Sequence, residues 1–590
     1  AFTDVTRETG INSSAIGYGL GVVVADINID GYPDLYIGND FHENDYLYIN
    51  QRNGTFKEEL NDHVMHTSQY TMGVDVADMN NDGYPDIVSM DMLPYDPYIL
   101  KRSLGEDNFD LYFRKIGYGY NYQYTRNNLQ LNRRNGMFSE IGLFAGVAAT
   151  DWSWATMFMD FDNDGNKDLF VSNGIPKRMN DMDYINYISN KQVQENINNK
   201  NGDGARDLSL INKFPEIKIP NKFYRNTGQL SFTDIENQIA DNVPNFSNGA
   251  AYADLNNDGD LDIVVSNIDE PVVVYENKAN DSKGTKFLEL KLQGPSSNVN
   301  AVGAKVFIFS KARLFSYEKY PVHGFMSSME VPLHIGMTNI RPDSIFLVWP
   351  DNSFQRLSDT SEGRMEISYE KDLPKFDYSI VVSHIQNETR KVEDVTGEVG
   401  LNYRHKENQF PEFDREFLLP HMLSTEGPAL AVADINKDGL DDVFIGSSKW
   451  EKNAVFLQNG AGRFLRTPQP ALDIDSVFED VAATWTDVNN DGNPDLVIAS
   501  GGNEFYGEDP NLSPRVYLND GKGTLARKPD AFENIFETFS SIVPIDFDDD
   551  GDMDLFIGSR AVPFHYGSVP RSYFLQIDGT GTFRDETEPF

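Results

Sequence analysis

The chain has 590 residues, of which 39% are hydrophobic and 12% aromatic, so it can bury the core of several domains or of one large repeat array. It contains no cysteine, which excludes disulfides, thiolate metal sites and a cysteine nucleophile. The net charge of −42 argues against nucleic acid as a partner, because acidic side chains repel phosphates. No apolar run reaches about 18 residues, so no transmembrane segment is expected in this chain.

A nine-residue pattern occurs seven times. These segments, named loops 1 to 7, are Asp26–Asp34, Asp78–Asp86, Asp160–Asp168, Asp254–Asp262, Asp434–Asp442, Asp487–Asp495 and Asp546–Asp554. Asp or Asn occupies positions 1, 3, 5 and 9, and Gly occupies position 6. Calcium takes six to eight oxygen ligands, and Gly permits the sharp turn that lets these side chains converge. The sequence therefore predicts about seven Ca²⁺ sites and no other cofactor.

The predicted ligands stand at positions 1, 3, 5, 7 and 9 of each loop, and position 7 acts through its backbone carbonyl. They are Asp26, Asn28, Asp30, Tyr32 and Asp34; Asp78, Asn80, Asp82, Tyr84 and Asp86; Asp160, Asp162, Asp164, Asn166 and Asp168; Asp254, Asn256, Asp258, Asp260 and Asp262; Asp434, Asn436, Asp438, Leu440 and Asp442; Asp487, Asn489, Asp491, Asn493 and Asp495; and Asp546, Asp548, Asp550, Asp552 and Asp554. Seven divalent ions would cancel 14 of the 42 negative charges, so much of the acidity is interpreted as a metal load.

The residues around each loop predict strands. Ala250–Ala253 precedes loop 4 and Ile263–Ser266 follows it, and β-branched runs of this kind favour strands over the helices that flank other calcium loops. A third strand-like run ends near an Asn in most units, and a Gly-containing turn leads to a fourth. Repetition of four strands predicts an all-β fold, a calcium-binding β-propeller of about seven four-stranded blades.

The number of candidate fourth strands exceeds the number of loops by one. They begin at Phe2, Phe56, Phe138, Phe232, Val392, Phe464, Leu525 and Phe583. Either the first and the last compete for the closing position, or Phe2 belongs to a blade that begins upstream of this chain.

Loop spacing predicts three insertions in a unit of somewhat over 50 residues. The first, about 94–125, contains the aromatic stretch Tyr112–Tyr124, interpreted as packing on the propeller rather than as a platform for sugar rings or a partner. The second, about 176–220, has the apolar spacing of an amphipathic helix at Met182, Ile185, Ile188, Val193 and Ile197. The third is large enough to be a domain. We therefore predict blades 1–4 in 1–279, an inserted small β domain in 280–388, and blades 5–7 with the closure in 389–590.

No catalytic motif is found. The nine His form no His-Glu-x-x-His, no Gly-x-Ser-x-Gly is present, and we interpret His323, His334 and His421 as structural. A carboxylate pair for glycoside chemistry cannot be chosen among 92 acidic residues. We predict no catalytic residues, although propeller scaffolds also support enzymes.

The loops and strands resemble the FG-GAP/VCBS repeats of integrin α-subunit propellers and bacterial surface proteins. Residues 285–360 resemble the ASPIC/UnbV domain through Asn300–Lys305, His323–Ser328, Pro332–Gly336 and Val348–Asp351. Repeats flanking such a domain are similar to the cartilage acidic protein family, and Asp151–Trp154, Leu419–His421 and Gly427–Ala431 are similar to its large Bacteroidota members. The resemblance implies binding or scaffolding, export, often as an outer-membrane lipoprotein, and repeats upstream of Ala1.

We therefore expect a non-enzymatic, calcium-stabilised cell-surface propeller that binds or scaffolds a protein or glycan partner in an outer-membrane complex. The expected location is the outer-membrane surface or the extracellular space. The alternatives are a polysaccharide-acting lyase or hydrolase on the same scaffold, and an adhesin. The three insertions are where we expect the activity.

Overall fold

The computed structural model describes residues 2–12, 14–105, 107–191, 208–311, 313–358, 362–385 and 392–588. The chain divides into two compact units, Ala1–Thr389 and Arg390–Phe590, which are described separately. Among the described residues, no helix has the length and apolar character needed to cross a membrane.

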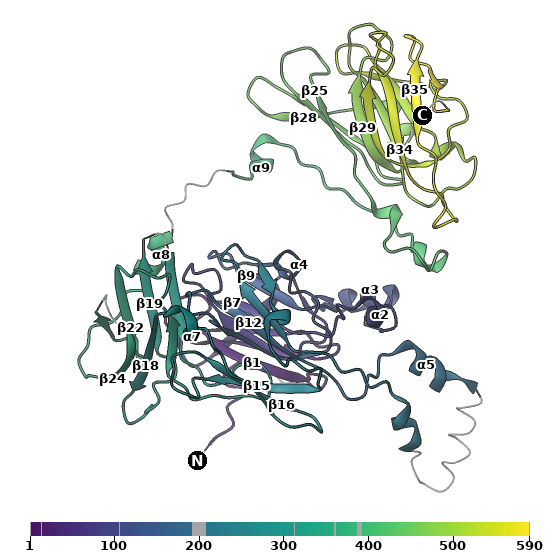
Figure 1. The fold of residues 1–590 in the computed structure, drawn as a ribbon. Helices are drawn as coiled ribbons and strands as arrows, with labels where there is room; N and C mark the ends of the chain where they lie inside the picture. Colours follow the sequence, from purple (N-terminus) through teal and green to yellow (C-terminus); the bar gives the residue numbers. More distant parts are fainter. Residues whose placement is uncertain are drawn as a thin grey trace. The chain divides into compact units, whose positions relative to one another are not determined.

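The first unit contains four antiparallel sheets that carry loops 1 to 4 (Figure 1). Their strands are β1 (Gly19–Ala25), β2 (Asp34–Asn39), β3 (Tyr46–Asn50) and β4 (Phe56–Glu58); β6 (Val74–Ala77), β7 (Asp86–Ser89), β9 (Asn128–Asn132) and β10 (Phe138–Glu140); β11 (Ser153–Met159), β12 (Asp168–Asn173), β13 (Lys222–Asn226) and β14 (Phe232–Asp234); and β15 (Ser247–Ala253), β16 (Asp262–Asn267) and β17 (Val273–Tyr275).

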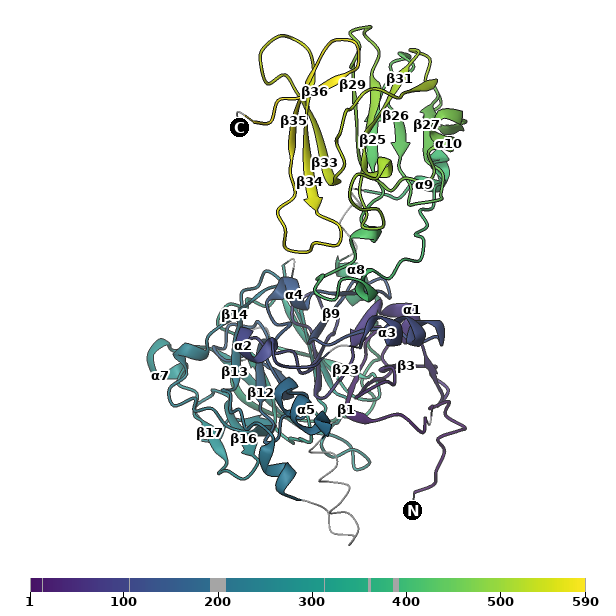
Figure 2. The same ribbon diagram turned by 90° about the vertical axis from the view of Figure 1, so that its right-hand side faces the viewer.

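The second unit contains three four-stranded sheets that carry loops 5 to 7 (Figure 2). Their strands are β25 (Leu430–Ala433), β26 (Asp442–Ile445), β27 (Ala454–Gln458) and β28 (Phe464–Thr467); β29 (Asp480–Thr486), β30 (Asp495–Ser500), β31 (Arg515–Asn519) and β32 (Leu525–Lys528); and β33 (Thr538–Ile545), β34 (Asp554–Ala561), β35 (Tyr573–Ile577) and β36 (Phe583–Asp585).

All seven sheets share one plan, which confirms the predicted all-β, propeller-like fold. The strands pair in chain order, and within each unit the first strands of successive sheets lie side by side. Second strands such as β12 and β30 are buried along their whole length. This burial explains their continuous apolar runs, because a strand covered on both faces has no reason to alternate.

The fourth sheet differs from the prediction because it has three strands, β15, β16 and β17. After β17 the chain leaves this sheet for the inserted domain, so no fourth strand follows. Two predicted fourth strands are wrong: the segments at Phe2 and Val392 form no strand in the described residues, and both side chains are exposed. The other six candidates begin β4, β10, β14, β28, β32 and β36, which resolves the surplus.

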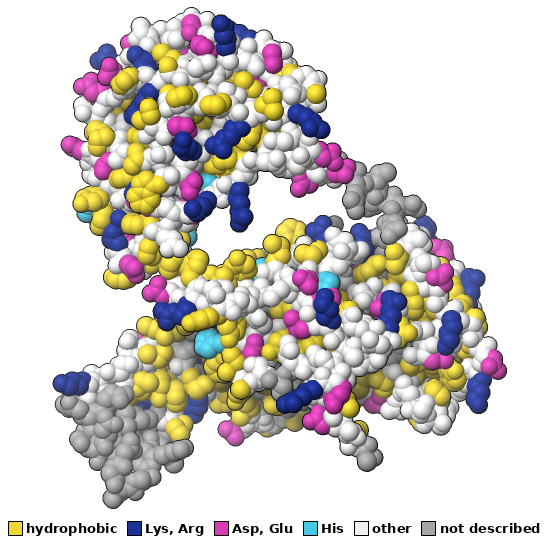
Figure 3. All heavy atoms as spheres, turned by 180° about the vertical axis from the view of Figure 1, so that it is seen from behind, with side chains coloured by type: hydrophobic (Ala, Val, Ile, Leu, Met, Phe, Trp, Pro, Cys, Tyr) yellow, Lys and Arg dark blue, Asp and Glu magenta, His cyan; other side chains and the backbone are white. Residues whose placement is uncertain are grey.

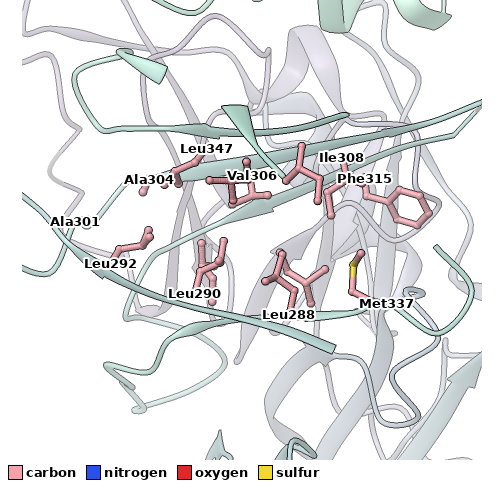
Figure 4. Packing of buried hydrophobic residues seen from close by; sticks show 14 of the residues in the cluster. Leu288, Leu290, Leu292, Ala301, Ala304, Val306, Ile308, Phe315, Met337 and Leu347 are labelled. Carbon is pink, nitrogen blue, oxygen red and sulfur yellow. The ribbon is translucent and has the colours of Figure 1, made fainter. Parts of the chain in front are cut away.

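Residues 280–388, named the inserted domain, form two sheets of their own. One consists of β18 (Phe287–Gln293), β21 (Leu333–Gly336) and β24 (Gly363–Ser368); the other of β19 (Lys305–Ser310), β20 (Arg313–Glu318), β22 (Ser344–Val348) and β23 (Phe354–Leu357). Leu288, Leu290, Val306, Ile308 and Leu347 pack between them in a closed apolar core (Figure 4).

The first two insertions carry short elements. Helices α2 (Pro97–Leu100) and α3 (Phe109–Gly117) precede β8 (Tyr122–Tyr124), which pairs with β5 (His66–Ser68). Tyr112 and Tyr124 stack and their hydroxyls lie 3.0 Å apart, whereas Tyr118 is exposed. Helix α5 (Met182–Ser189) begins where predicted, and Val193 and Ile197 lie outside the described residues. Among the described residues, the other α-helices are α1 (Leu60–His63), α4 (Gly142–Ala145), α7 (Asn280–Lys283), α8 (Ser379–Ile385), α9 (Thr396–Val399) and α10 (Pro470–Ile474).

An asparagine at the end of the third strand, or just after it, links neighbouring sheets. The Asn226 amide donates to the Lys167 carbonyl in its own loop at 2.9 Å and to the Met79 carbonyl in loop 2 at 2.8 Å. Asn132, Asn277 and Asn519 make the same pair of bonds, and we name this contact the asparagine bridge. The equivalent residues of the fifth and seventh sheets are Gln458 and Ile577.

Replacing a bridging asparagine should weaken the first unit. Asn226→Ala leaves two buried carbonyls without donors, so we expect the free energy of unfolding to fall by about 2–4 kcal/mol. Chemical denaturation of the full chain measures this, with the exposed Asn237→Ala as the matched control. A loss below about 0.5 kcal/mol, the range of ordinary surface substitutions, would contradict a bridging role.

Candidate metal centres

Every loop folds around the carboxylate of position 1. Its Oδ1 accepts a hydrogen bond from the N–H of position 5, and its Oδ2 accepts one from the Gly N–H of position 6, at 2.7–3.2 Å in all seven loops. These two hydrogen bonds alone account for Asp at position 1. Its carboxylate also has enough lone pairs to bind both N–H groups and an ion.

The Asp at position 9 fastens the loop to the third strand. Its Oδ1 accepts from a third-strand N–H at 2.7–2.8 Å. Its Oδ2 accepts from the N–H of position 2 at 2.8–3.4 Å. These carboxylates are buried in all seven loops, so they act as structural acceptors as well as predicted ligands.

The sharp turn uses two left-handed residues, of which the sequence predicts only one. Gly at position 6 has φ between 82° and 94°. Position 4 is also left-handed, with φ between 56° and 65°, although an Ile occupies it in loop 1 (Ile29) and a Lys in loop 5 (Lys437). A β-branched residue rarely adopts this conformation, so the carboxylate network must hold it there.

The donor set fits a hard cation. Carboxylate oxygens of Asp160, Asp162 and Asp168 lie within 4.8 Å of one another, as do those of Asp546, Asp548 and Asp554. In loop 2 the buried Oδ1 of Asn80, at position 3, has no hydrogen-bond partner among the described residues. Clustered oxygens and an unused acceptor are what Ca²⁺ prefers, so side chains at positions 1, 3, 5 and 9 would hold it.

The electrostatics of the loops also favour a cation. Burial, followed by repulsion from neighbouring carboxylates, raises the pKa of Asp160 to about 8. Burial likewise raises the pKa of Asp34 to about 7, where Asp26 and Asp30 add repulsion. Buried carboxylates that repel one another are stabilised by a positive charge held among them.

The loops differ in exposure. Position 1 is buried in loops 1, 2 and 3, and is half-buried in loop 4 and in loops 5, 6 and 7. Asp260, predicted at position 7 of loop 4, turns its carboxylate to Asn163 and to the Asn280 N–H, at 2.8 and 2.6 Å. That side chain therefore connects loops 3 and 4, which is compatible with position 7 acting through its carbonyl.

The motifs Asp151–Trp154 and His323–Ser328 make contacts that the sequence does not predict. The carboxylate of Asp151 pairs with the guanidinium of Arg178, and both side chains are fully buried. Trp154 packs on Phe325 of the inserted domain, with ring centroids 4.8 Å apart. His323 Nδ1 lies 2.7 Å from Asp75 Oδ1. Burial alone would lower the pKa of His323, but Asp75 raises it above the ordinary value.

The segment around His323 closes a cavity in the first unit. Gly324 exchanges two backbone hydrogen bonds with Val74 on β6, which brings the inserted domain against the first strands. Beside this contact is a cavity of about 110 Å³, lined by residues that include the ionisable Lys167, Glu318 and His323. The His323–Ser328 motif therefore attaches the inserted domain to the sheets.

A second polar cluster lies in the second unit and was missed by sequence reasoning. Glu479 is buried and its carboxylate accepts from the Lys449 N–H at 3.1 Å. The Lys449 ammonium pairs with Glu504, and Glu407 pairs with His405. Burial, with repulsion from Glu407 and Glu504, raises the pKa of Glu479 to about 9. These residues are up to 99 positions apart in the chain, so no local motif marks them.

Two family models match the sequence. The model described as FG-GAP-like repeat matches residues 26–89, 200–301, 434–498 and 487–557. The model described as ASPIC and UnbV matches residues 294–371, within the inserted domain. No curated protein matches the sequence.

Two solved structures show a distant likeness. One is a lectin of Agrocybe aegerita that recognises non-reducing terminal N-acetylglucosamine, at 12% identity and a TM-score of 0.20 over 95% of this chain and 92% of that one. The other is a biofilm matrix protein of V. cholerae, at 12% identity and a TM-score of 0.20 over 95% of this chain and 88% of that one. A TM-score of 0.20 does not indicate a shared fold.

Two substitutions in loop 5 should distinguish a carboxylate that accepts structural hydrogen bonds from one whose main role is to bind calcium. Asp442→Ala removes the acceptor of the Ile435 and Gln458 N–H groups, so it should cost about 2–4 kcal/mol even in chelator. Asp438→Asn keeps an acceptor for the Leu440 N–H and should weaken only the stabilisation that calcium adds. Thermal unfolding of both variants with calcium and with chelator measures this. Equal losses in chelator would contradict the distinction.

Proposed function

Because the chain is a protein of FG-GAP-like repeats with an ASPIC and UnbV domain, we propose that it is a non-enzymatic, calcium-stabilised cell-surface protein that binds or scaffolds a protein or glycan partner. The repeats and the domain indicate a surface or adhesion-type β-propeller. We further propose that the loops bind calcium, that the partner is a protein or a glycan, and that the protein lies at the outer-membrane surface or in the extracellular space. There it would belong to an outer-membrane complex.

The observation that carries the proposal is the identical hydrogen-bond plan of seven acidic loops. Each loop joins two strands, so it lacks the helix pair that calcium sensors open and close. Calcium bound there would offset two of the three or more carboxylate charges of a loop and hold the first two strands of a sheet together. A metal that binds only the folded chain stabilises it, which favours a structural role over a signalling one.

In each unit taken by itself, the partner surface is proposed at the sheet edge opposite the loops. In an antiparallel sheet, the connection from the second to the third strand lies at the other end from the first-to-second connection. The insertions of about 94–125 and 176–220 fall in second-to-third connections, as do the exposed rings of Phe41, Trp450 and Tyr506. Hydrophobic side chains also lie among the charged ones on the face that Figure 3 shows.

Bulky side chains at this edge also occupy strained backbone. Phe41, Trp450 and Phe564 occupy second-to-third connections and have φ of 66°, 69° and 66°. A bulky residue in the left-handed region is strained, and such strain concentrates at binding sites. Tyr506 packs edge-to-face on Phe564, with ring centroids 4.6 Å apart, which fixes an aromatic pair at the surface of the second unit.

The cluster of Glu407, Glu479 and Glu504 favours one second candidate function, a polysaccharide-acting enzyme. The pKa of Glu479, raised to about 9, keeps that carboxyl protonated at neutral pH, as a general acid requires. Its neighbours Glu407 and Glu504 are paired with His405 and Lys449. Trp450 lies beside this cluster and could support a sugar ring by stacking.

Chelation should destabilise the protein. At free calcium 100 times Kd, each loop would add about 2.7 kcal/mol, so excess chelator should lower the melting temperature by roughly 10 °C or more. Differential scanning calorimetry with calcium, with chelator, and after calcium is restored measures this. A melting curve that is unchanged in excess chelator would contradict a structural role for calcium.

Substitutions at Trp450 test the proposed partner surface, and a substitution at Glu479 tests the alternative of an enzyme. Trp450→Ala should abolish, and Trp450→Phe should largely keep, binding to a glycan array or to partners recovered by native pull-down with mass spectrometry. Exposed Leu465→Ala in the same unit is the control. Polysaccharide cleavage that is lost in Glu479→Gln would support the enzyme instead. Unchanged binding in Trp450→Ala would contradict the assigned edge.

A further inference from the structure

The inserted domain contacts all four metal loops of the first unit at the same carboxylate. Lys305 Nζ lies 3.0 Å from Oδ2 of Asp26, and the Ser316 N–H donates to Oδ2 of Asp78 at 2.9 Å. The guanidinium of Arg364 pairs with Oδ2 of Asp254. At loop 3 the contact is Gly336, where a Cβ would come within 1.9 Å of Oδ2 of Asp160.

The domain also covers the turn of each of these loops. A side chain on the position 6 Gly would collide with Tyr378 at Gly31, Leu314 at Gly83, Ile340 at Gly165 and Phe287 at Gly259. In the second unit, Gly439 and Gly551 have no described atom in such a position within 4 Å, and Gly492 has only Lys437. Loops 1 to 4 are therefore covered loops, and loops 5 to 7 are uncovered loops.

Part of this contact is apolar. Ile29 of loop 1 and Tyr84 of loop 2 belong to one buried cluster with Leu314, Phe307 and Phe376 of the inserted domain. Ile29 occupies the left-handed position 4, so its side chain reaches this cluster only while the turn is formed. Lys305 also faces the buried carboxylate of Glu318, which offsets its positive charge beside loop 1.

Three backbone N–H groups of the domain depend on the loops for acceptors. Leu314 N–H donates to the Asn81 carbonyl at 3.2 Å, and Thr338 N–H to the Asn163 carbonyl at 3.0 Å. Ser316 N–H is the third. Strand β20 is an edge strand of its sheet, so loop 2 covers an edge that would otherwise be unpaired. Both carbonyl acceptors belong to left-handed residues at position 4.

We infer that loops 1 to 4 are composite sites in which calcium binding and docking of the inserted domain strengthen each other. The inference rests on the proposed function, because it requires that the loops bind calcium. Docking needs the turn and the position 1 carboxylate in the observed arrangement. Repulsion among the carboxylates opposes that arrangement, and a divalent cation favours it. Linkage then requires the docked domain to raise the calcium affinity of the loops that it covers.

Hydrogen exchange with mass spectrometry on the full chain tests the first half. Calcium should slow exchange in uncovered loops 5 to 7, and also at the docking amides of Leu314, Ser316 and Thr338. The β19–β22 pairing inside the domain reports whether the domain itself stays folded. Slower exchange in the uncovered loops without a change at the docking amides would overturn the inference and leave the proposed function standing. No change anywhere would overturn both.

A docking variant tests the reciprocal half. Leu314→Ala removes an apolar contact and no charge, so covered loops should need about fivefold more calcium for protection, and uncovered loops should not change. Asn352→Gly is a milder second variant, since it removes a 3.1 Å hydrogen bond to the Gly31 carbonyl and tolerates the φ of 65°. Exposed Leu465→Ala is the control. Equal calcium dependence of covered loops in both variants and wild type would overturn the coupling.

Discussion

The fold depends on carboxylates that must be held close together. In each sheet, the position 1 Asp closes the turn and the position 9 Asp ties that turn to the third strand. Their oxygens satisfy N–H groups that the tight turn would otherwise leave unpaired, and their charges repel one another. The arrangement that satisfies the backbone N–H groups therefore also favours binding of a cation.

This constraint extends beyond a single sheet. The asparagine bridge carries the position of one loop to the next, as Asn226 does from its own loop to the Met79 carbonyl of loop 2. The inserted domain rests on the resulting row of loops in the first unit, through Ser316 and Thr338 among others. In the first unit, the inserted domain thus covers the loop edge of the sheets.

The repeat made much of this predictable. A spacing of Asp, Asn and Gly, repeated seven times between strand-like runs, identifies the loops and the sheets from local residues alone. The prediction of fourth strands at Phe2 and Val392 is wrong. Both sequences suit an outer strand, but a strand forms only where a neighbouring strand is available to pair with it. The left-handed Ile29 contradicts local preference, since tertiary contacts impose it. Lys305, Arg364 and Glu479 gain their roles from distant partners, which no spacing reveals.

We propose that each loop binds one calcium ion. Native mass spectrometry of the full chain, exchanged into calcium and then into chelator, counts those ions directly. The account predicts seven ions on the wild type and four on the triple variant Asp434→Ala, Asp487→Ala, Asp546→Ala, which removes position 1 from the uncovered loops. A chain whose mass is the same in calcium and in chelator would contradict it.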